Sequence, residues 1–267
     1  MNIIDFHAHI YPDKIAARAV ESIGDFYGLH MDGKGTADAL LAEDKSCGIT
    51  KSVVHSVAVT PERVGAVNDY IMSECSKHSE FIGFGTIHAG SEDKIPEVER
   101  FLSAGLKGVK IHPDTQLFEM DDERMNELYD YLAQCGIPIL IHCGDYRYGY
   151  SHPSRLKKIL HRFPKLTVVA AHFGGWSIFD LAYEYLADEH CYLDTSSSFP
   201  MTGLRRAREL IRLYGAERMV FGTDFPMWNV ADELEEFMNI GLGDNENELI
   251  LHKNAEKILG IDKTPDM

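Results

Sequence analysis

The sequence predicts a single (β/α)8 barrel domain over residues 1–267, and three observations support this fold class. The chain has 267 residues, close to the roughly 250 that are typical of such barrels. Eight short apolar runs recur along it, separated by amphipathic helical segments. The first run is followed by HAHIYP, where a doubly wound open sheet usually carries a glycine-rich phosphate loop. A closed barrel is therefore the better interpretation, with its functional site at the C-terminal face of the strands.

The eight runs are nearly continuous in apolar residues, as expected for parallel strands that are buried on both faces. They cover residues 3–6, 52–59, 81–87, 108–111, 137–141, 166–171, 191–195 and 219–222. Segments such as IPEVERFLSAG and HPSRLKKILHRFP lie between them and indicate repeated βαβ units. Most units have the length of about 30 residues that a βαβ step requires. The first unit is longer, with helices predicted over 14–26 and 36–47.

Composition and charge exclude several classes of partner. The formal net charge of −16 would repel phosphate-rich molecules, so we expect no nucleic-acid partner. The five cysteines are odd in number and none is spaced C-x-x-C, which argues against a disulfide framework. No run reaches the roughly 20 apolar residues of a membrane span, and the N-terminal residues lack the pattern of a signal peptide. We expect a cytoplasmic protein without a membrane partner, and a homodimer on base rate alone.

Ionisable side chains recur at the C-terminal ends of the predicted strands. In IIDFHAH, alternation places Asp5, His7 and His9 on one face of the first strand. An isolated H-x-H pair is more often a hydrogen-bonded strand end than a metal site. Here, however, four further strands end in such residues, namely His112, His142, His172 and Asp224. Ionisable groups rarely share a buried site without a cation, so the pattern predicts a metal centre.

The residue types indicate which metal this centre would hold. Histidines and one carboxylate suit a borderline-soft divalent cation with an open position for water. We expect one Zn²⁺ per chain, with Mn²⁺ or Fe²⁺ as alternatives.

Several motifs resemble the amidohydrolase superfamily, in the branch that contains decarboxylases similar to aminocarboxymuconate-semialdehyde decarboxylase. They are IDFHAHIYP, HPSRLKKILHRFPKLTVVAAHFGG, GTDFP and ELILHKNAEKILGI, and together they span essentially the whole chain. The resemblance implies that His7, His9, His142 and Asp224 bind the metal. It also implies that His172 orients or deprotonates the metal's water and that Asp224 can also carry a proton. These motifs are specific for the family and weakly specific for the substrate.

Other positions are candidates for contacts with a small-molecule substrate. Lys110 and His112 face inward on the fourth strand. In binuclear relatives a lysine of this strand is carboxylated and bridges two metal ions, and for Lys110 this role is the less favoured hypothesis. Arg147 and Tyr146 follow the fifth strand and could hold a substrate carboxylate, or could belong to an ordinary surface loop. His55 and His88 lie in or near the second and third runs, and each belongs either to the pocket wall or to the core as a hydrogen-bonded histidine.

Three functions follow from this interpretation, in decreasing order of support. The first is a metal-dependent hydrolase that acts on an amide, a lactone or another ester. The second is a lyase that decarboxylates or hydrates an unsaturated or aromatic carboxylic acid. The shortness of the chain favours the first, because the decarboxylases it resembles are usually longer. The third is a barrel that binds a ligand without catalysis, and the intact set of candidate ligands argues against it.

Overall fold

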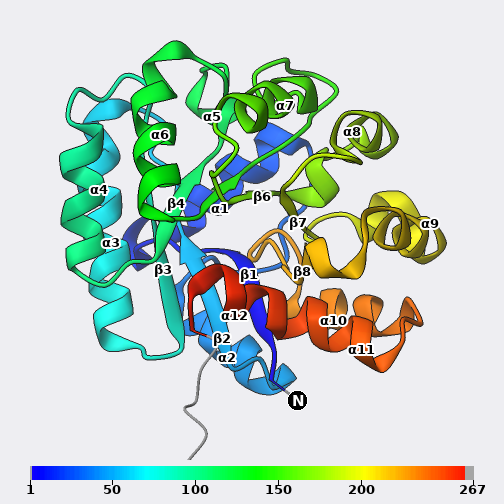
Figure 1. Cartoon of the computed structure of the whole chain (residues 1–267). Helices are drawn as coiled ribbons and strands as arrows, with labels where there is room; N and C mark the ends of the chain where they lie inside the picture. Colours follow the sequence, from blue (N-terminus) through cyan, green and yellow to red (C-terminus); the bar gives the residue numbers. More distant parts are fainter. Residues whose placement is uncertain (1, 262–267) are drawn as a thin grey trace, which may run out of the picture.

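The computed structural model describes residues 2–261 and contains an eight-stranded parallel sheet in the order β1 to β8 (Figure 1). The strands are Ile4–His9, Lys51–His55, Phe81–Thr86, Gly108–Ile111, Ile139–Ile141, Val168–Ala170, Tyr192–Asp194 and Met219–Val220, numbered β1 to β8. Each pairs in parallel with the next. Each of the eight predicted runs overlaps a strand, and the (β/α)8 fold class is confirmed. The run 52–59 was predicted too long, because β2 ends at His55 and the chain then leaves the sheet.

Helices alternate with the strands and form the outer layer (Figure 1). They are α1 (Asp13–Tyr27), α2 (Ala37–Cys47), α3 (Val64–Lys77), α4 (Lys94–Ser103), α5 (Pro113–Gln116), α6 (Asn126–Cys135), α7 (Pro153–Arg162), α8 (Phe179–Leu186), α9 (Phe199–Tyr214), α10 (Val230–Asn239), α11 (Asp244–Glu248) and α12 (Asn254–Leu259). None of the helices within residues 2–261 is long and apolar enough to cross a membrane. The two helices predicted in the first unit are α1 and α2. Thr36 caps α2 by accepting a hydrogen bond from the backbone N–H of Ala39.

The barrel closes between β1 and β8 through backbone hydrogen bonds. Phe6 N donates to Phe221 O at 2.8 Å, and Asp224 N donates to His7 O at 2.8 Å. A parallel bridge joins Ala8 to Phe225. These contacts extend β8, which is itself only two residues long, and bring the segment after it alongside the C-terminal half of β1.

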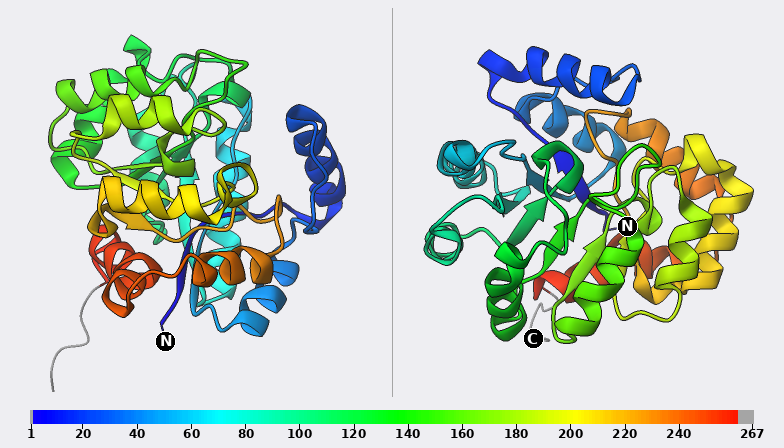
Figure 2. Two further views of the ribbon diagram at one scale, coloured as in Figure 1. Left: turned by 90° about the vertical axis from the view of Figure 1, so that its right-hand side faces the viewer. Right: turned by 90° about the horizontal axis from the view of Figure 1, so that it is seen from above.

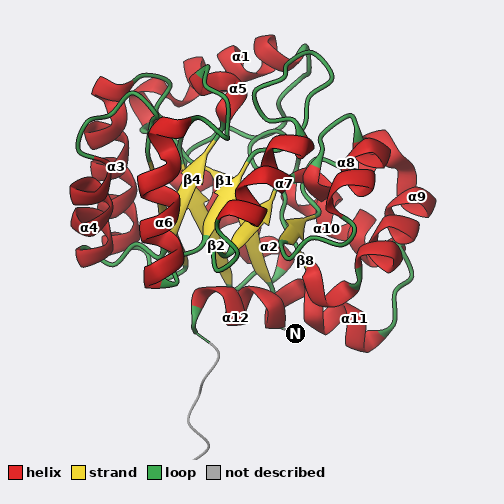
Figure 3. Cartoon of the chain, turned by 45° about the horizontal axis from the view of Figure 1, so that its top comes forward, coloured by secondary structure: helices red, strands yellow, loops and turns green. Residues whose placement is uncertain are grey.

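Two apolar layers hold the barrel together. Inward-facing side chains such as Phe6, Val53, Phe84, Leu140 and Val169 fill the interior and contact α12, which covers the N-terminal end of the strands (Figure 3). A larger cluster lies between the strands and the outer helices. This separation follows from the near-continuous apolar strands, since each strand buries both of its faces.

Helix α1 lies at the end of the barrel opposite α12, on the same side as α5 (Figure 3). Figure 2 shows it apart from the ring of helices that surrounds the strands. Only Ala16 and Gly24 are buried among its residues. Because the C-terminal ends of parallel strands carry the functional groups of such barrels, α1 is placed to cover the site.

A buried carboxyl between α2 and β2 makes stability depend on pH. Asp44 accepts a hydrogen bond from Ser52 Oγ at 2.7 Å, while its Oδ1 has no partner among the described residues. Burial raises the pKa of Asp44 to about 7, whereas the unfolded chain releases this proton near pH 4. The stabilisation from the neutral carboxyl is therefore present at low pH and is lost as the pH rises from about 4 through 7.

We expect Asp44→Asn, which keeps the acceptor for Ser52, to stabilise the protein at pH 8 by about 1–3 kcal/mol. The same change should have a clearly smaller effect at pH 5, where the carboxyl of the folded protein is still protonated. Thermal unfolding at both pH values measures this, with the exposed Asp25→Asn of α1 as the control. An equal effect of Asp44→Asn at both pH values would contradict the assignment.

Candidate metal centre

Three candidate ligands converge where β1 meets the segment after β8. His7 Nε2 lies 3.3 Å from His9 Nε2 and 3.3 Å from Asp224 Oδ1, and His9 Nε2 lies 3.4 Å from the same oxygen. His7 and His9 both reach this point, but simple alternation from Asp5 does not hold, because Phe6 also faces the interior and the register of β1 against β2 shifts between Asp5 and Ala8. The backbone bond from Asp224 N to His7 O positions the carboxylate beside them.

The spacing of these three atoms fits a single divalent cation. Ligands held at about 2.0–2.1 Å in tetrahedral geometry lie about 3.3–3.4 Å from one another. Burial, followed by the nearby cationic groups, lowers the pKa of His7 and of His9, so both rings are neutral as ligands must be. Burial alone would favour the neutral acid of Asp224, but His7, His9 and His172 hold its pKa well below the usual range. Two lone pairs and one carboxylate therefore face the same point.

Asp194, at the end of β7, fixes the orientation of His7. Its Oδ2 accepts from His7 Nδ1 at 2.8 Å, which leaves the lone pair of His7 on Nε2. Its Oδ1 accepts from His172 N at 2.9 Å and from Ser196 Oγ at 2.6 Å. Such carboxylate–histidine pairs orient metal ligands. Asp194 was not among the predicted site residues, although an acidic residue at the end of the apolar run YLD carries the same signal as Asp224.

His142 and His172 form a second contact in the centre. His142 Nε2 donates to Gly144 O at 3.0 Å, and His172 Nδ1 donates to Ser196 O at 2.9 Å. These bonds place the lone pairs of the neutral rings on His142 Nδ1 and His172 Nε2, which face each other at 3.1 Å. Two facing lone pairs need a proton or a cation between them.

The predicted ligands are thus not all in mutual contact. Among the described residues, His142 makes polar contacts with His172, Gly144 and Asp114 but none with His7, His9 or Asp224. His172 lies between His142 and the group formed by His7, His9 and Asp224. Its ring centroid is 5.1 Å from that of His7 and 4.9 Å from that of His142.

Strained backbone accompanies these residues. His172 and Asp224 have φ of 58°, and Ser197 has φ of 52°. Each is a non-glycine residue in the left-handed region, at a cost of order 1–3 kcal/mol, and such residues cluster at functional sites. Ser197 Oγ donates to Asp224 Oδ2 at 2.5 Å and accepts from Trp228 Nε1 at 2.8 Å. This pair of bonds holds the carboxylate that the strained backbone presents.

His112 and Asp114 lie on the opposite wall, after β4. The ring of His112 stacks on that of His142 with centroids 3.8 Å apart, and its Nε2 contacts Tyr27 Oη at 2.8 Å. Asp114 Oδ2 accepts from Ser151 and lies 3.4 Å from His142 Nε2, while its Oδ1 has no partner among the described residues. Burial raises the pKa of Asp114 to about 7. Asp114 was not singled out in the sequence, because it follows the strand end by two residues.

Lys110 faces inward below the cavity. Its side chain is fully buried, and Nζ donates to His7 Nε2 at 2.8 Å. Burial lowers the pKa of Lys110 to about 8, although Asp224 and Asp194 partly oppose this. Lys110 does not line the cavity, so the structure gives no support to a direct contact with substrate. It acts instead on a candidate metal ligand.

A cavity of about 800 Å³ opens above these groups. Its floor contains His7, His9, His112, His142, His172 and Asp224. The rest of its wall is largely apolar and comes from α1, from the segment after β2 and from α3, including Ile15, Ala19, Ile23, Val57, Val59 and Val67. Arg63 is the one lysine or arginine side chain among these described lining residues. The cavity therefore suits a small, mostly apolar molecule with few polar groups.

Arg147 and Tyr146 do not line this cavity. Arg147 binds Asp145 through Nε and Nη2 and donates to Phe26 O at 2.6 Å, so its guanidinium holds the end of α1. Tyr146 is 74% exposed. The substrate contacts predicted for both residues find no support in these positions.

The fold and this site define a class, the (β/α)8 barrels with a histidine–carboxylate centre at the C-terminal face. The model of the amidohydrolase family matches residues 4–261. The chain therefore belongs to the amidohydrolase family, whose members are metal-dependent enzymes. The resemblance stated from the motifs is confirmed. No curated protein matches the sequence.

Solved structures share the fold over almost the whole chain. An uncharacterized TIM-barrel protein from Bordetella bronchiseptica is 22% identical, with a TM-score of 0.78 over 98% of this chain and 99% of that chain. A dihydroxybenzoic acid decarboxylase from Polaromonas, with bound manganese and the inhibitor 2-nitroresorcinol, is 17% identical, with a TM-score of 0.78 over 99% and 98%. A probable 2-pyrone-4,6-dicarboxylic acid hydrolase from Acinetobacter baumannii, with citric acid bound, is 16% identical, with a TM-score of 0.71 over 97% and 100%.

The ammonium of Lys110 contacts His7 Nε2, so it would compete with a cation that binds this nitrogen, and the competition would depend on pH. Below about pH 8 Lys110 carries a positive charge, and above it the charge is lost. Metal affinity should therefore rise as the pH increases through 8. In Lys110→Met this part of the rise should disappear, and affinity at pH 6.5 should increase about tenfold relative to wild type. Competition titrations at pH 6.5, 7.5 and 8.5 measure this, and an unchanged profile in the variant would exclude Lys110 as the competitor.

Proposed function

We propose that this protein is a metal-dependent hydrolase that cleaves an amide, a lactone or another ester of a small molecule. The observation that carries the proposal is the triangle of His7 Nε2, His9 Nε2 and Asp224 Oδ1, with 3.3–3.4 Å between each pair, at the floor of the cavity. His7, His9, His142 and Asp224 would hold one divalent cation, with Zn²⁺ preferred over Mn²⁺ or Fe²⁺. When bound, such a cation lowers the pKa of water toward about 7 and polarises a carbonyl.

The residues of the centre divide the remaining work. His172 keeps a lone pair on Nε2 because its Nδ1 donates to Ser196 O, so it can orient a water and accept its proton. Asp224 stays ionised, since its neighbours lower its pKa, and this favours its role as a ligand. A general acid that returns a proton to the leaving group works best with a pKa near neutrality, which Asp224 does not have.

A second candidate is a lyase that decarboxylates or hydrates an unsaturated or aromatic acid. The apolar wall of the cavity favours it, because it could enclose an aromatic ring. The shortness of the chain no longer argues against it, since the chain spans 98% of the dihydroxybenzoic acid decarboxylase chain. A barrel that only binds a ligand is the third candidate, and the complete donor set speaks against it.

The metal content of the purified, never-chelated protein tests the proposal first. We expect about one equivalent of a divalent metal per chain by elemental analysis. Turnover assays with lactones, amides and carboxylated arenes then separate the reactions. Release of carbon dioxide from an arene would favour the lyase. If no metal is found and none rebinds on addition of zinc or manganese, the metal-dependent function is wrong.

The role of His172 is tested by His172→Asn. We expect turnover to fall by about 10²–10⁴-fold, the usual contribution of a general base, while the metal content stays at the wild-type level. His161→Asn, on the exposed face of α7, serves as the matched control and should leave both quantities unchanged. Unaltered turnover in His172→Asn would remove this residue from the mechanism.

A further inference from the structure

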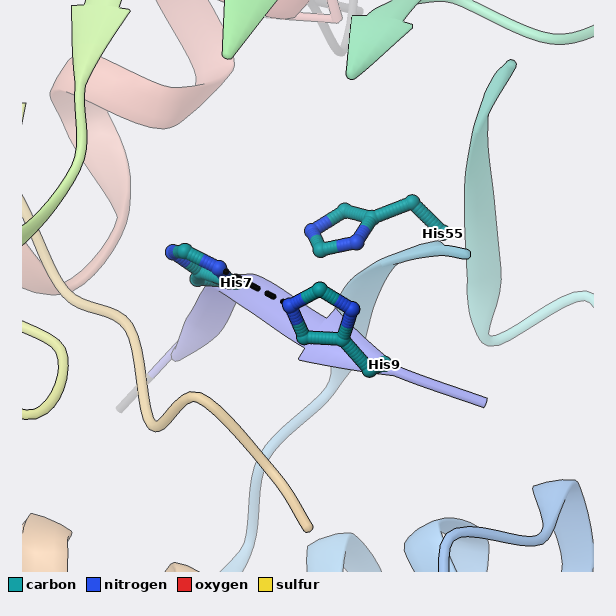
Figure 4. Close-up of side chains that lie close together, drawn as sticks. All are labelled: His7, His9 and His55. Carbon is teal, nitrogen blue, oxygen red and sulfur yellow. Dashed lines mark hydrogen bonds between the residues drawn. The ribbon is translucent and has the colours of Figure 1, made fainter. Parts of the chain in front are cut away.

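The histidines near the ends of β2 and β3 do not belong to the cavity wall. His55 is fully buried beside His7 and His9 and has no hydrogen-bond partner among the described residues (Figure 4). His88 contacts Gln116 O at 3.0 Å. Neither His55 nor His88 lines the cavity. A substrate therefore meets the helices and loops that surround the floor and not these two rings.

One face of α3 forms part of the cavity wall and begins with an arginine. Arg63, Ala66, Val67 and Tyr70 all line the cavity, at the spacing of a single helix face. Helix α3 starts on the side of the C-terminal strand ends, because it follows β2 and runs back to the start of β3. Arg63 therefore lies farther from the strand ends than Tyr70, by roughly 10 Å along the helix axis.

Buried hydrogen bonds fix this helix against the barrel. Asn68 Oδ1 accepts from Thr86 N at 2.7 Å, and its Nδ2 donates to Thr86 O at 3.0 Å, at the end of β3. Tyr70 Oη donates to Tyr11 O at 2.9 Å. Arg63 is thus carried by a firmly held element, and its height above the floor is a property of the fold.

The guanidinium of Arg63 is exposed and makes no ion pair or hydrogen bond with residues 2–261. Free arginines are common on protein surfaces, and Arg18 on the outer face of α1 is another one in the described part of the chain. Arg63 differs because it lines the cavity and supplies the one Lys or Arg charge among its described lining residues. In a chain with a net charge of −16, such a cation favours the approach of an anionic molecule to this cavity.

Exposed apolar side chains surround the mouth of the same cavity. Ile15, Val59 and Leu117 are 51%, 47% and 69% exposed, and all three line the cavity. Leu117 also has φ of 56°, a left-handed conformation that is unfavourable for leucine. Exposed apolar groups of this kind mark surfaces that a ligand covers. The cavity therefore suits a molecule whose apolar part extends from the floor to the mouth.

We propose that Arg63 binds an anionic group at the far end of a long, largely apolar substrate whose hydrolysable bond lies at the floor. The inference rests on the proposed function and names the substrate class for that site. An arginine is suited to this role because its planar guanidinium binds a carboxylate through two parallel hydrogen bonds. The anionic group and the reacting carbonyl lie on the order of 10 Å apart. A short acid, with its anionic group beside the reacting carbon, cannot contact Arg63 and the floor together.

Hydroxamic acids, which bind the metal at one end, test this inference on the Zn²⁺-loaded protein. Octanohydroxamic acid ends in a methyl group, and the monohydroxamate of suberic acid ends in a carboxylate on a chain of the same length. We expect wild type to bind the carboxylate probe about five- to tenfold more tightly. In Arg63→Met this preference should disappear, while the Kd of octanohydroxamic acid and the Tm stay at their wild-type values. Isothermal titration calorimetry measures both Kd values.

Charge reversal gives a positive signature. Arg63→Glu should bind ω-aminooctanohydroxamic acid more tightly than the suberic acid derivative, which is the reverse of wild type. Arg18→Met and Arg18→Glu are the matched controls, because Arg18 is exposed and does not line the cavity, and both should keep the wild-type preference. Equal Kd values for the carboxylate and methyl probes in wild type, or an unchanged preference in both Arg63 variants, would overturn the inference.

The outcomes for Arg63 and for the proposed function are distinct. A carboxylate preference that depends on Arg63, without turnover of any ester, lactone or amide, would support the anion subsite and contradict the hydrolase. Metal-dependent hydrolysis without a carboxylate preference would overturn the subsite alone. Where turnover is found, Arg63→Met should raise KM for a substrate with a remote carboxylate and leave kcat unchanged, because Arg63 lies far from the bond that is cleaved. A protein that binds neither metal nor probe would overturn both.

Discussion

The candidate metal centre depends on the seam between β1 and β8. Asp5 is buried there and accepts from His7 N at 2.9 Å, from Thr223 N at 3.0 Å and from Thr223 Oγ1 at 2.6 Å. These bonds join the first strand to the segment after the last one where β8 has already ended. Because they fix the backbone on both sides, Asp224 can hold a left-handed conformation that would otherwise be unfavourable. Barrel closure and assembly of the ligands are therefore one structural event.

Fixed acceptors then determine where each lone pair points. Asp194, Gly144 O and Ser196 O each accept a hydrogen bond from one ring nitrogen of His7, His142 and His172, respectively. The other nitrogen of each ring faces the centre. Burial lowers the pKa of His7 and His142, so the centre combines inward lone pairs with one ionised carboxylate. Such a site is electrostatically incomplete without a cation. The Lys110 ammonium supplies one positive charge in its place, through a bond to the same nitrogen that a metal would use.

The sequence was sufficient to predict the barrel because strand burial leaves a one-dimensional signal of apolar runs with polar ends. The same signal located His7, His9 and Asp224, which lie together. The sequence pattern could not predict that His142 would contact His172, because this contact depends on which backbone carbonyl accepts a hydrogen bond from each ring. It also could not place Arg147, which donates to Phe26 O at the end of α1, or show that His55 has no hydrogen-bond partner among the described residues. Such distinctions arise from side-chain contacts between strands that are distant in sequence.

The choice between hydrolysis and decarboxylation depends on the groups that face the centre more than on the centre itself. Both reactions can use the same ligands, and both need an acid that delivers a proton at neutral pH. Asp224 is poorly suited, since its pKa is held far below neutrality. Asp114 lines the cavity, its buried Oδ1 has no partner among the described residues, and burial raises its pKa to about 7. If a substrate reaches this carboxyl, it could protonate a leaving group or a carbanion, so the same acid would serve either of the two candidate reactions.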